Sequence, residues 1–407
     1  MVYQPPTGAR DLFPVDVAQK RWIEDRLQQV FHRWGYHRII TSTLERMDTL
    51  MAGGAIERST VIQLQDRDEE LGMRPELTAS IARAAATRMA GAAEPLRFYY
   101  NANVFRRSLQ DDFNRQQEYY QAGVELLGAG SVAADAEVLW LLSDCVQNLN
   151  LESCHLVLGE AGLTRSLFSA FPEAVRKDVR EAIATLDRIG LEALPLSPEL
   201  RDRALLLLDL RGRPQDVLQR VSSLPLDESQ QEMVLRLKAL VELLEDQDAG
   251  TVLPSLILDL SLIQTFDYYT GIVFEVVSSP ESGRRILAQG GRYDQLLGLY
   301  HPQGQSSPGI GFVFNIEDLH QVLLPSGQLP LQTAEVDWLV VPQTPEAMGA
   351  AFAHAKHLRQ SDSVCVEMEL GLGSSADEVR NYGRDRRIRQ IAWVKADGSV
   401  DVETLRS

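Results

Sequence analysis

Two neighbouring segments, 96–104 and 118–127, have the pattern of antiparallel strands joined by a polar loop. Along the second segment, Gln121, Gly123 and Glu125 would share one face, because successive side chains of a strand point to opposite sides. Gly123 has no side chain, so a polar notch remains between its neighbours where a small ligand could lie against the backbone. An edge strand with its polar face in water explains the spacing equally well.

Hydrophobic periodicity places other elements on both sides of this strand pair. Apolar residues at helical spacing predict helices at about 15–34 and 77–90. Further strands are expected at 36–44, 272–277 and 309–314. Apolar residues make up 44% of the chain and charged residues 24%, which is the balance of a globular protein.

At 407 residues the chain is too long for one ordinary core, so two or three domains are expected. A core would span 1–325, with a helical insertion at about 163–250 where Leu, Ala, Arg and Glu dominate. Prolines and a glycine at the end of this core predict a linker at 326–335. The tail, 336–407, has a β-α-β rhythm that indicates a small α/β domain.

The chain carries a formal net charge of -17, which argues against nucleic acid as a partner, because binding a phosphate backbone depends on Lys and Arg. Acidic residues also outnumber basic ones in the tail. Its one basic cluster is interpreted first as a solvated helix face and second as an RNA contact; it comprises Arg384, Arg386, Arg387 and Arg389.

The sequence points to a cytoplasmic protein without a membrane span or a metal. No apolar run approaches the ~18 residues of a membrane span, and the N-terminus lacks the pattern of a secretory signal. Three cysteines without CxxC spacing suggest neither disulfides nor zinc. His354 and His357 are three residues apart on an expected helix, which a solvated face explains.

Three other polar motifs have ordinary structural explanations when taken singly. In the segment 74–78, Pro75 fixes a turn and Thr78 is placed like a helix cap. Tyr268 and Tyr269 enter an expected strand, where core packing is the usual reason for paired tyrosines. The glycine pair at 290–291 is a turn signal and a weak indication of a phosphate site.

In combination and in this order, the motifs resemble those of histidyl-tRNA synthetases, which are class II enzymes, over the whole chain. The matching stretches are GARDLFP (8–14), RPELT (74–78), RFYYNANVFRR with QEYYQAGVELLG (97–128), DYYTG (267–271), GGRYD (290–294) and GIGFVFNIEDL (309–319). This resemblance implies an α+β fold. A six-stranded antiparallel class II sheet would be flanked by helices, with a helical insertion and a small anticodon-binding-like α/β domain at the C-terminus.

The resemblance also implies a histidine pocket. Glu76 and Thr78 match residues that hold the ligand's α-amino group, with Gln121 nearby. Glu125 and Tyr268 match the groups that read the two imidazole nitrogens, as one acceptor and one donor at fixed separation can. With Tyr269 as a neighbouring wall and the surviving motif 2 arginine, the expected histidine-binding set is Glu76, Thr78, Arg106, Gln121, Glu125, Tyr268 and Tyr269.

The ATP side departs from the synthetase pattern. Gln264 and Asp318 stand where the family has arginines, and Asn315 stands where it has a glycine next to adenine. Ser108 replaces the motif 2 glutamate, and Ser42 replaces the motif 1 proline of the dimer contact. Loss of one charge-stabilising group commonly costs ~10²–10³ in rate, so we expect no catalytic residue and no amino acid activation.

An intact histidine pocket beside a dismantled ATP site resembles the regulatory subunits of ATP phosphoribosyltransferase. The resemblance implies a hetero-oligomer with a short catalytic chain, a homodimeric core, L-histidine as ligand and control of the first step of histidine biosynthesis. No cofactor is expected. Two alternatives remain open: an active or divergent histidyl-tRNA synthetase, and a non-catalytic relative that senses uncharged tRNA.

Overall fold

The computed structural model describes residues 3–54, 56–66, 68–107, 116–151, 153–245, 254–262, 268–278, 284–371 and 375–405. Within these ranges the chain divides into two units, Met1–Pro330 and Leu331–Ser407.

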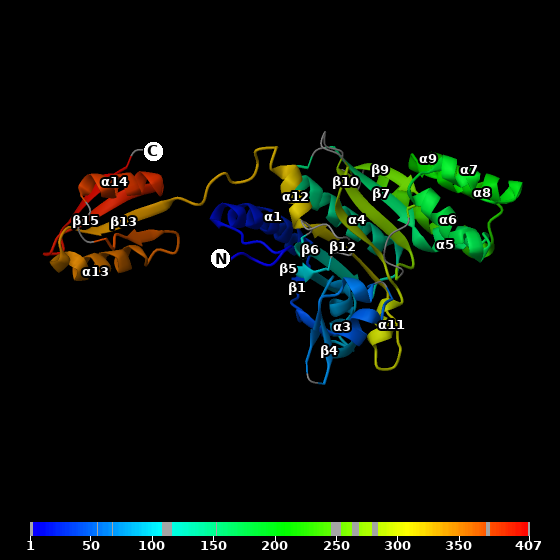
Figure 1. Cartoon of the computed structure of the whole chain (residues 1–407), viewed down its shortest axis with the longest axis horizontal. Coiled ribbons are helices and arrows are strands. Elements are labelled where there is room, and N and C mark those ends of the chain that lie inside the picture. The colour runs from blue at the N-terminus through cyan, green and yellow to red at the C-terminus, as the bar shows by residue number, and fades with distance from the viewer. Residues whose placement is uncertain are drawn as a thin grey trace. The chain divides into compact units, whose positions relative to one another are not determined.

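A mixed sheet organises the first unit (Figure 1). In spatial order its nine described strands are β1 (His37–Arg38), β5 (Leu96–Phe105), β6 (Glu118–Leu127), β12 (Gly309–Asn315), β11 (Arg285–Arg292), β10 (Ile272–Ser278), β7 (Cys154–Glu160), β9 (Ser255–Asp259) and β8 (Arg211–Gly212). The six neighbours from β5 to β7 run antiparallel, as expected. Parallel pairing of β1 with β5 and of β9 with β7 extends the sheet beyond the six expected strands.

Alternating side chains divide the sheet into two apolar faces. On one face, the helices α1 (Pro14–Arg33), α4 (Val132–Asn148) and α12 (Ile316–Leu323) pack over residues such as Val124 and Phe312. On the other face, α3 (Thr78–Arg88) and α11 (Leu296–Tyr300) pack over residues such as Phe98 and Tyr100. Both faces of the sheet are therefore covered, and the second face carries the candidate site.

The expected helical insertion follows β7 and is gathered at one end of the sheet (Figure 1). It contains α5 (Ala161–Phe168), α6 (Glu173–Ala184), α7 (Arg188–Ala193), α8 (Pro198–Leu208), α9 (Pro214–Ser222) and α10 (Glu228–Glu245). The short strand β8 interrupts these helices and pairs with β9 at the sheet edge. Helical periodicity could not predict β8, because two residues are too few to show a period.

The strand expected at 36–44 is wrong in length. Only His37 and Arg38 pair with β5, and the chain then leaves for a separate three-stranded sheet. That sheet consists of β2 (Leu44–Arg46), β4 (Glu70–Met73) and β3 (Gln63–Gln65), and a short helix, α2 (Met47–Met51), follows β2.

The second unit has the expected β-α-β pattern. Its strands are β13 (Val336–Pro342), β14 (Val366–Met368), β15 (Ile388–Val394) and β16 (Val400–Thr404), in the order β14-β13-β15-β16 with β16 antiparallel. Two helices, α13 (Met348–Leu358) and α14 (Ala376–Asp385), contribute to separate apolar clusters that involve this sheet.

The arginine cluster of the tail does not form one helix face. Arg384 lies in α14, whereas Arg389 lies in β15 and Arg387 has a left-handed backbone between them. Three of the four arginines pair with acidic neighbours of the same unit: Arg386 with Glu367 (2.7 Å), Arg387 with Glu335 (2.7 Å), and Arg389 with Glu335 (2.7 Å) and Asp337 (3.0 Å). These pairs neutralise much of the basic cluster. Among the described residues, no helix is both long and apolar enough to cross a membrane.

Phe31 tests the packing of α1 on the sheet. Its ring is fully buried and lies 5.6 Å from the ring of Tyr99 and 6.2 Å from that of Phe312, measured between centroids. Phe31→Ala should lower the free energy of unfolding by about 3–5 kcal/mol in urea titrations, because it leaves a cavity. Phe13→Ala, at the exposed start of the same helix, is the matched control and should cost less than about 0.5 kcal/mol. Equal losses in the two variants would contradict this packing.

Candidate functional site

One pocket on the α3 side of the sheet brings together all seven residues of the expected histidine-binding set. Its lining includes Glu76, Thr78, Arg106, Gln121, Glu125, Tyr268 and Tyr269. They come from the start of α3, the end of β5, the middle of β6 and the segment that leads into β10. Residues as far apart in the sequence as Glu76 and Tyr269, which are separated by 193 positions, therefore converge on one site.

The start of α3 is capped differently from the expectation. Thr78 is the first residue of the helix and makes no side-chain cap. Instead the Glu76 carboxylate accepts hydrogen bonds from the backbone N–H of Thr78 (2.6 Å) and of Ala79 (2.9 Å), which would otherwise lack partners. Burial raises the pKa of Glu76, and these backbone bonds oppose that rise. Thr78 is thereby released to turn its hydroxyl toward the pocket.

Glu125 lies at the centre of the pocket and is almost fully buried. Its carboxylate accepts hydrogen bonds from the Thr78 hydroxyl (2.8 Å) and from the Tyr293 hydroxyl. Gly311, its cross-strand neighbour on β12, makes room for this carboxylate, because a Cβ there would overlap it. Burial, reinforced by repulsion from Glu76, raises the pKa of Glu125 to about 8, while the two hydroxyls oppose the rise.

Four tyrosines form the aromatic part of the wall. The ring of Tyr268 lies 4.9 Å from that of Tyr269 and 5.9 Å from that of Tyr293, both edge-on. Tyr100 occupies the space beside Gly123, where a Cβ would overlap its ring, so the notch predicted for a ligand is filled by a side chain. Burial raises the pKa of Tyr268 and of Tyr293 well above the usual range. All four phenols are therefore neutral donors at physiological pH.

Sequence reasoning missed Tyr100 and Tyr293 as pocket residues. Tyr293 lies within the quoted GGRYD motif and was given no role. Tyr100 pairs with Gly123 across β5 and β6, and recognising it required the strand register. A bulky residue opposite a strand glycine is the signal that could have identified it.

The remaining two expected ligands, Gln121 and Arg106, also line the pocket. Gln121 donates from Nε2 to Asn315 Oδ1 (3.2 Å), so the residue in place of the family's glycine contacts the pocket's own amide. Arg106 donates from Nε to the carbonyl of Pro75 (2.8 Å). Burial lowers the pKa of Arg106, and the nearby charge of Glu76 opposes that change.

Of the three positions where we expect the ATP site to be lost, Asp318 and Asn315 are described, and Gln264 lies outside the described residues, as does Ser108. Asp318 is not among the residues that line the pocket and pairs with Arg285 on β11 at 3.6 Å, with both side chains about one-third exposed. Burial raises the pKa of Asp318, and Arg285 opposes the rise.

The pocket suits a small zwitterion with a polar ring. Glu76 and Glu125 offer acceptors to an ammonium and to a ring N–H, and the phenols offer donors. Its open volume is only about 20 Å³, close to the ~10–15 Å³ that one water requires. Among the described residues, the side chains of the wall leave less open space than an amino acid occupies.

Known proteins similar to this chain identify its family. The family model described as histidyl-tRNA synthetase matches residues 8–319. A protein of Trichormus variabilis named ATP phosphoribosyltransferase regulatory subunit is 66% identical over the full length of both chains. The chain belongs to the family of ATP phosphoribosyltransferase regulatory subunits. A protein of the same name from Synechococcus elongatus is 54% identical and is matched over all of this chain and 98% of that one.

Solved structures agree with this family. A Bacillus halodurans protein described as an ATP phosphoribosyltransferase regulatory subunit/histidyl-tRNA synthetase superposes with a TM-score of 0.80 at 26% identity, over 97% of this chain and 99% of that one. A histidyl-tRNA synthetase of a Nostoc species has a TM-score of 0.78 over 99% and 97% of the two chains; at 20% identity it supports the fold alone. The fold and family expected from the motifs are confirmed, and the roles of the pocket residues remain predictions.

The raised pKa of Glu125 predicts how stability depends on pH. Its carboxyl would lose its proton near its ordinary pKa in the unfolded chain but only near pH 8 in the folded one. Between these values the unfolded state binds fewer protons, so stability should fall as pH rises from about 5 to about 8, by on the order of a few kcal/mol. Thermal unfolding of wild type and Glu125→Gln at pH 5 and pH 8.5 measures this effect. The variant should lose less stability over that range, and equal losses would refute the assignment.

Proposed function

We propose that this chain is the non-catalytic regulatory subunit of a hetero-oligomeric ATP phosphoribosyltransferase. It would support the activity of a short catalytic chain and make that activity respond to L-histidine. The observation behind the proposal is full-length identity of 66% to a protein named as such a subunit. Its role in the cell would then be to control the first step of histidine biosynthesis, in the cytoplasm.

The geometry of the pocket supports L-histidine as its ligand. In our proposal the α-amino group lies near Glu76, Thr78 and Gln121, and Glu125 and Tyr268 read the imidazole ring beside Tyr269. The buried carboxyl group of Glu125 already accepts hydrogen bonds from two hydroxyls, so it can exchange one of these bonds for one from a ligand N–H without being left unpaired. Such partners discriminate strongly against ligands that lack the ring nitrogens.

The charge at the former ATP side supports the absence of amino acid activation. Adenylate formation needs cations aimed at developing negative charge. At position 318 this chain has a carboxylate engaged with Arg285, and Gln264 is uncharged. We propose that neither contributes to ATP binding.

We further propose that the core forms a homodimer and that tRNA is not a partner. The net charge of -17 opposes phosphate binding. Three arginines of the tail already pair with carboxylates of their own unit.

The direct test mixes this chain with the short catalytic subunit of the same genome and follows formation of product from ATP and phosphoribosyl pyrophosphate. Activity should rise about tenfold or more over the catalytic chain alone and fall when L-histidine is added. An unrelated protein at the same concentration serves as the control. If the mixture behaves like the catalytic chain alone, the partner assignment is wrong. Histidine-dependent ATP–pyrophosphate exchange would make the chain a synthetase, and salt-sensitive tRNA binding would favour a tRNA sensor.

Isothermal titration with L-histidine tests the pocket separately. Wild type should bind with measurable heat, and Glu125→Ala should weaken binding by about 100-fold or more, because a buried partner of the imidazole is removed. Glu118→Ala, on the same strand but outside the pocket lining, is the matched control and should bind like wild type. No heat with wild type, or equal affinity of the Glu125 variant, would contradict the proposed site.

A further inference from the structure

A second cavity lies between α10 and the core of the first unit. Its open volume is about 250 Å³, much larger than that of the tyrosine-lined pocket. The α10 residues Met233, Arg236 and Leu237 line one side, and Thr270 and Arg292 line the other. Leu237, Leu240 and Val241 pack α10 into the main apolar core. The cleft beside Met233 and Arg236 leaves that part of the helix without the close packing that is normal in an interior.

The two cavities share a wall made of the segments 268–272 and 292–294. Tyr269 and Tyr293 face the first pocket, whereas their neighbours Thr270 and Arg292 line the second cavity. The segments are tied together: the backbone N–H of Thr270 donates to the carbonyl of Arg292 (2.7 Å), and that of Asp294 donates to the Thr270 hydroxyl (2.9 Å). A displacement of Tyr269 or Tyr293 would therefore move Thr270 and Arg292, which line the second cavity.

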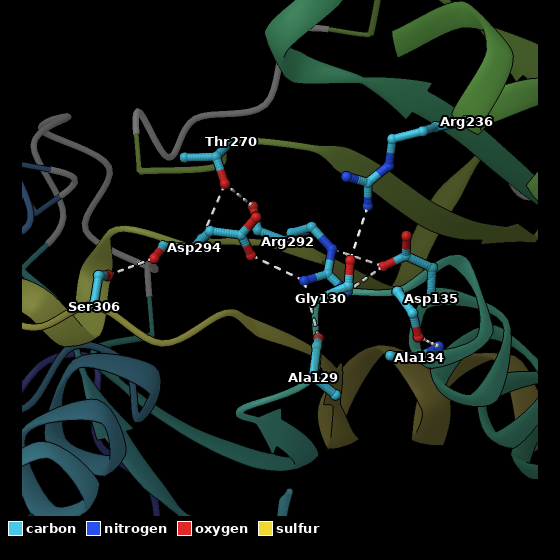
Figure 2. Close-up of polar contacts among 10 residues, drawn as sticks. Ala129, Gly130, Ala134, Asp135, Arg236, Thr270, Arg292, Asp294 and Ser306 are labelled. Carbon is cyan, nitrogen blue, oxygen red and sulfur yellow. Dashed lines mark hydrogen bonds and ion pairs between the residues drawn. The ribbon is translucent and has the colours of Figure 1, made fainter. Parts of the chain in front are cut away.

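Arg292 anchors this wall to the first turn of α4 and to the loop that precedes this helix (Figure 2). Only 2% of its surface is exposed. Its guanidinium donates to Asp135 through Nε (2.8 Å) and Nη2 (2.5 Å), and through Nη1 to Asp294 (2.9 Å) and the carbonyl of Ala129 (3.1 Å). With every nitrogen engaged, this rigid planar group cannot shift without moving its partners.

The next carbonyl of the same loop accepts a hydrogen bond from an arginine of α10. Arg236 donates from Nη2 to the carbonyl of Gly130 (3.0 Å), as Figure 2 shows. Adjacent peptide groups, at Ala129 and Gly130, thus connect Arg292 on the wall with Arg236 on the insertion helix. The contact spans the edge of the second cavity, and Arg236 itself is exposed.

We propose that filling of the tyrosine-lined pocket is transmitted to α10 through this wall, with the Arg236–Gly130 contact as the variable link. The inference rests on the proposed function, since it takes L-histidine as the ligand. The open volume of about 20 Å³ is small for an amino acid, and Tyr269 and Tyr293 are part of the lining that a ligand would displace in our proposal. Thr270 and Arg292 shift with them, and α10 has the space to respond. The surface of the insertion helices would thereby differ between the empty and the histidine-bound subunit.

The alternative is that the Arg292–Asp135 pair only holds the core together. Buried ion pairs are weak evidence for either role, so the variant must break the link without removing the pair. Arg236→Met does so on an exposed helix position and keeps the aliphatic stem. Lys238→Met is its matched control, because Lys238 lies on the same helix and its ion pair among the described residues is with Glu242 of that helix, at 3.8 Å.

Hydrogen–deuterium exchange of the full chain, with and without saturating L-histidine, tests the proposal, with the Kd measured by titration. In wild type and Lys238→Met, histidine should change the exchange rate of the backbone amides in Glu228–Glu245 by about fivefold. In Arg236→Met that change should be lost, while the pocket segments remain protected and the Kd stays within about twofold of wild type.

Each other outcome is decisive. An unchanged α10 in histidine-bound wild type, or an α10 response in Arg236→Met equal to that of wild type, overturns the coupling and leaves the histidine site intact. Absence of histidine binding to wild type overturns the site itself, and the coupling with it.

Discussion

A carboxylate buried in the middle of a β-sheet is the constraint on which the site depends. Glu125 has no access to water, so each oxygen needs a donor from the protein. Thr78 supplies one from the start of α3, and Tyr293 supplies the other from the end of β11. These two bonds hold a helix and a strand end against β6. The glycine at position 311 follows from the same constraint, because no larger residue leaves room for the carboxylate.

In our proposal the chain keeps an amino acid pocket but has a different charge pattern beside it, as a synthetase fold that serves regulation would. Class II catalysis needs the amino acid and ATP on neighbouring parts of one sheet. Here the pocket presents carboxylates and phenols, whereas Asp318, which is not among its lining residues, pairs with Arg285. A site that binds a ligand without catalysing a reaction can still regulate a partner if ligand binding alters the surface of the subunit. The hollow beneath α10 and the arginines around Ala129 and Gly130 offer such a route.

The charges of this chain come from two observations, its overall composition and the pairing of arginines in the second unit. The overall excess of acidic residues was evident from composition alone. Only the structure shows that Glu335, Asp337 and Glu367 meet the arginines of the tail, because the partners are 19 to 54 positions apart in the sequence. The interpretation of these arginines as one helix face was wrong, since the helix ends before Arg387.

Local pattern determined the long elements and the family of this protein. The periodicity of 96–104 and 118–127 predicted β5 and β6, and alternation placed Gln121 and Glu125 on one face, because both depend only on neighbours in the sequence. Tertiary structure decided the rest. Tyr100 fills the notch at Gly123 through strand register, Glu76 rather than Thr78 caps α3, and Tyr293 completes the partners of Glu125. Such contacts join residues that are close only after folding, so no period or spacing in the sequence encodes them.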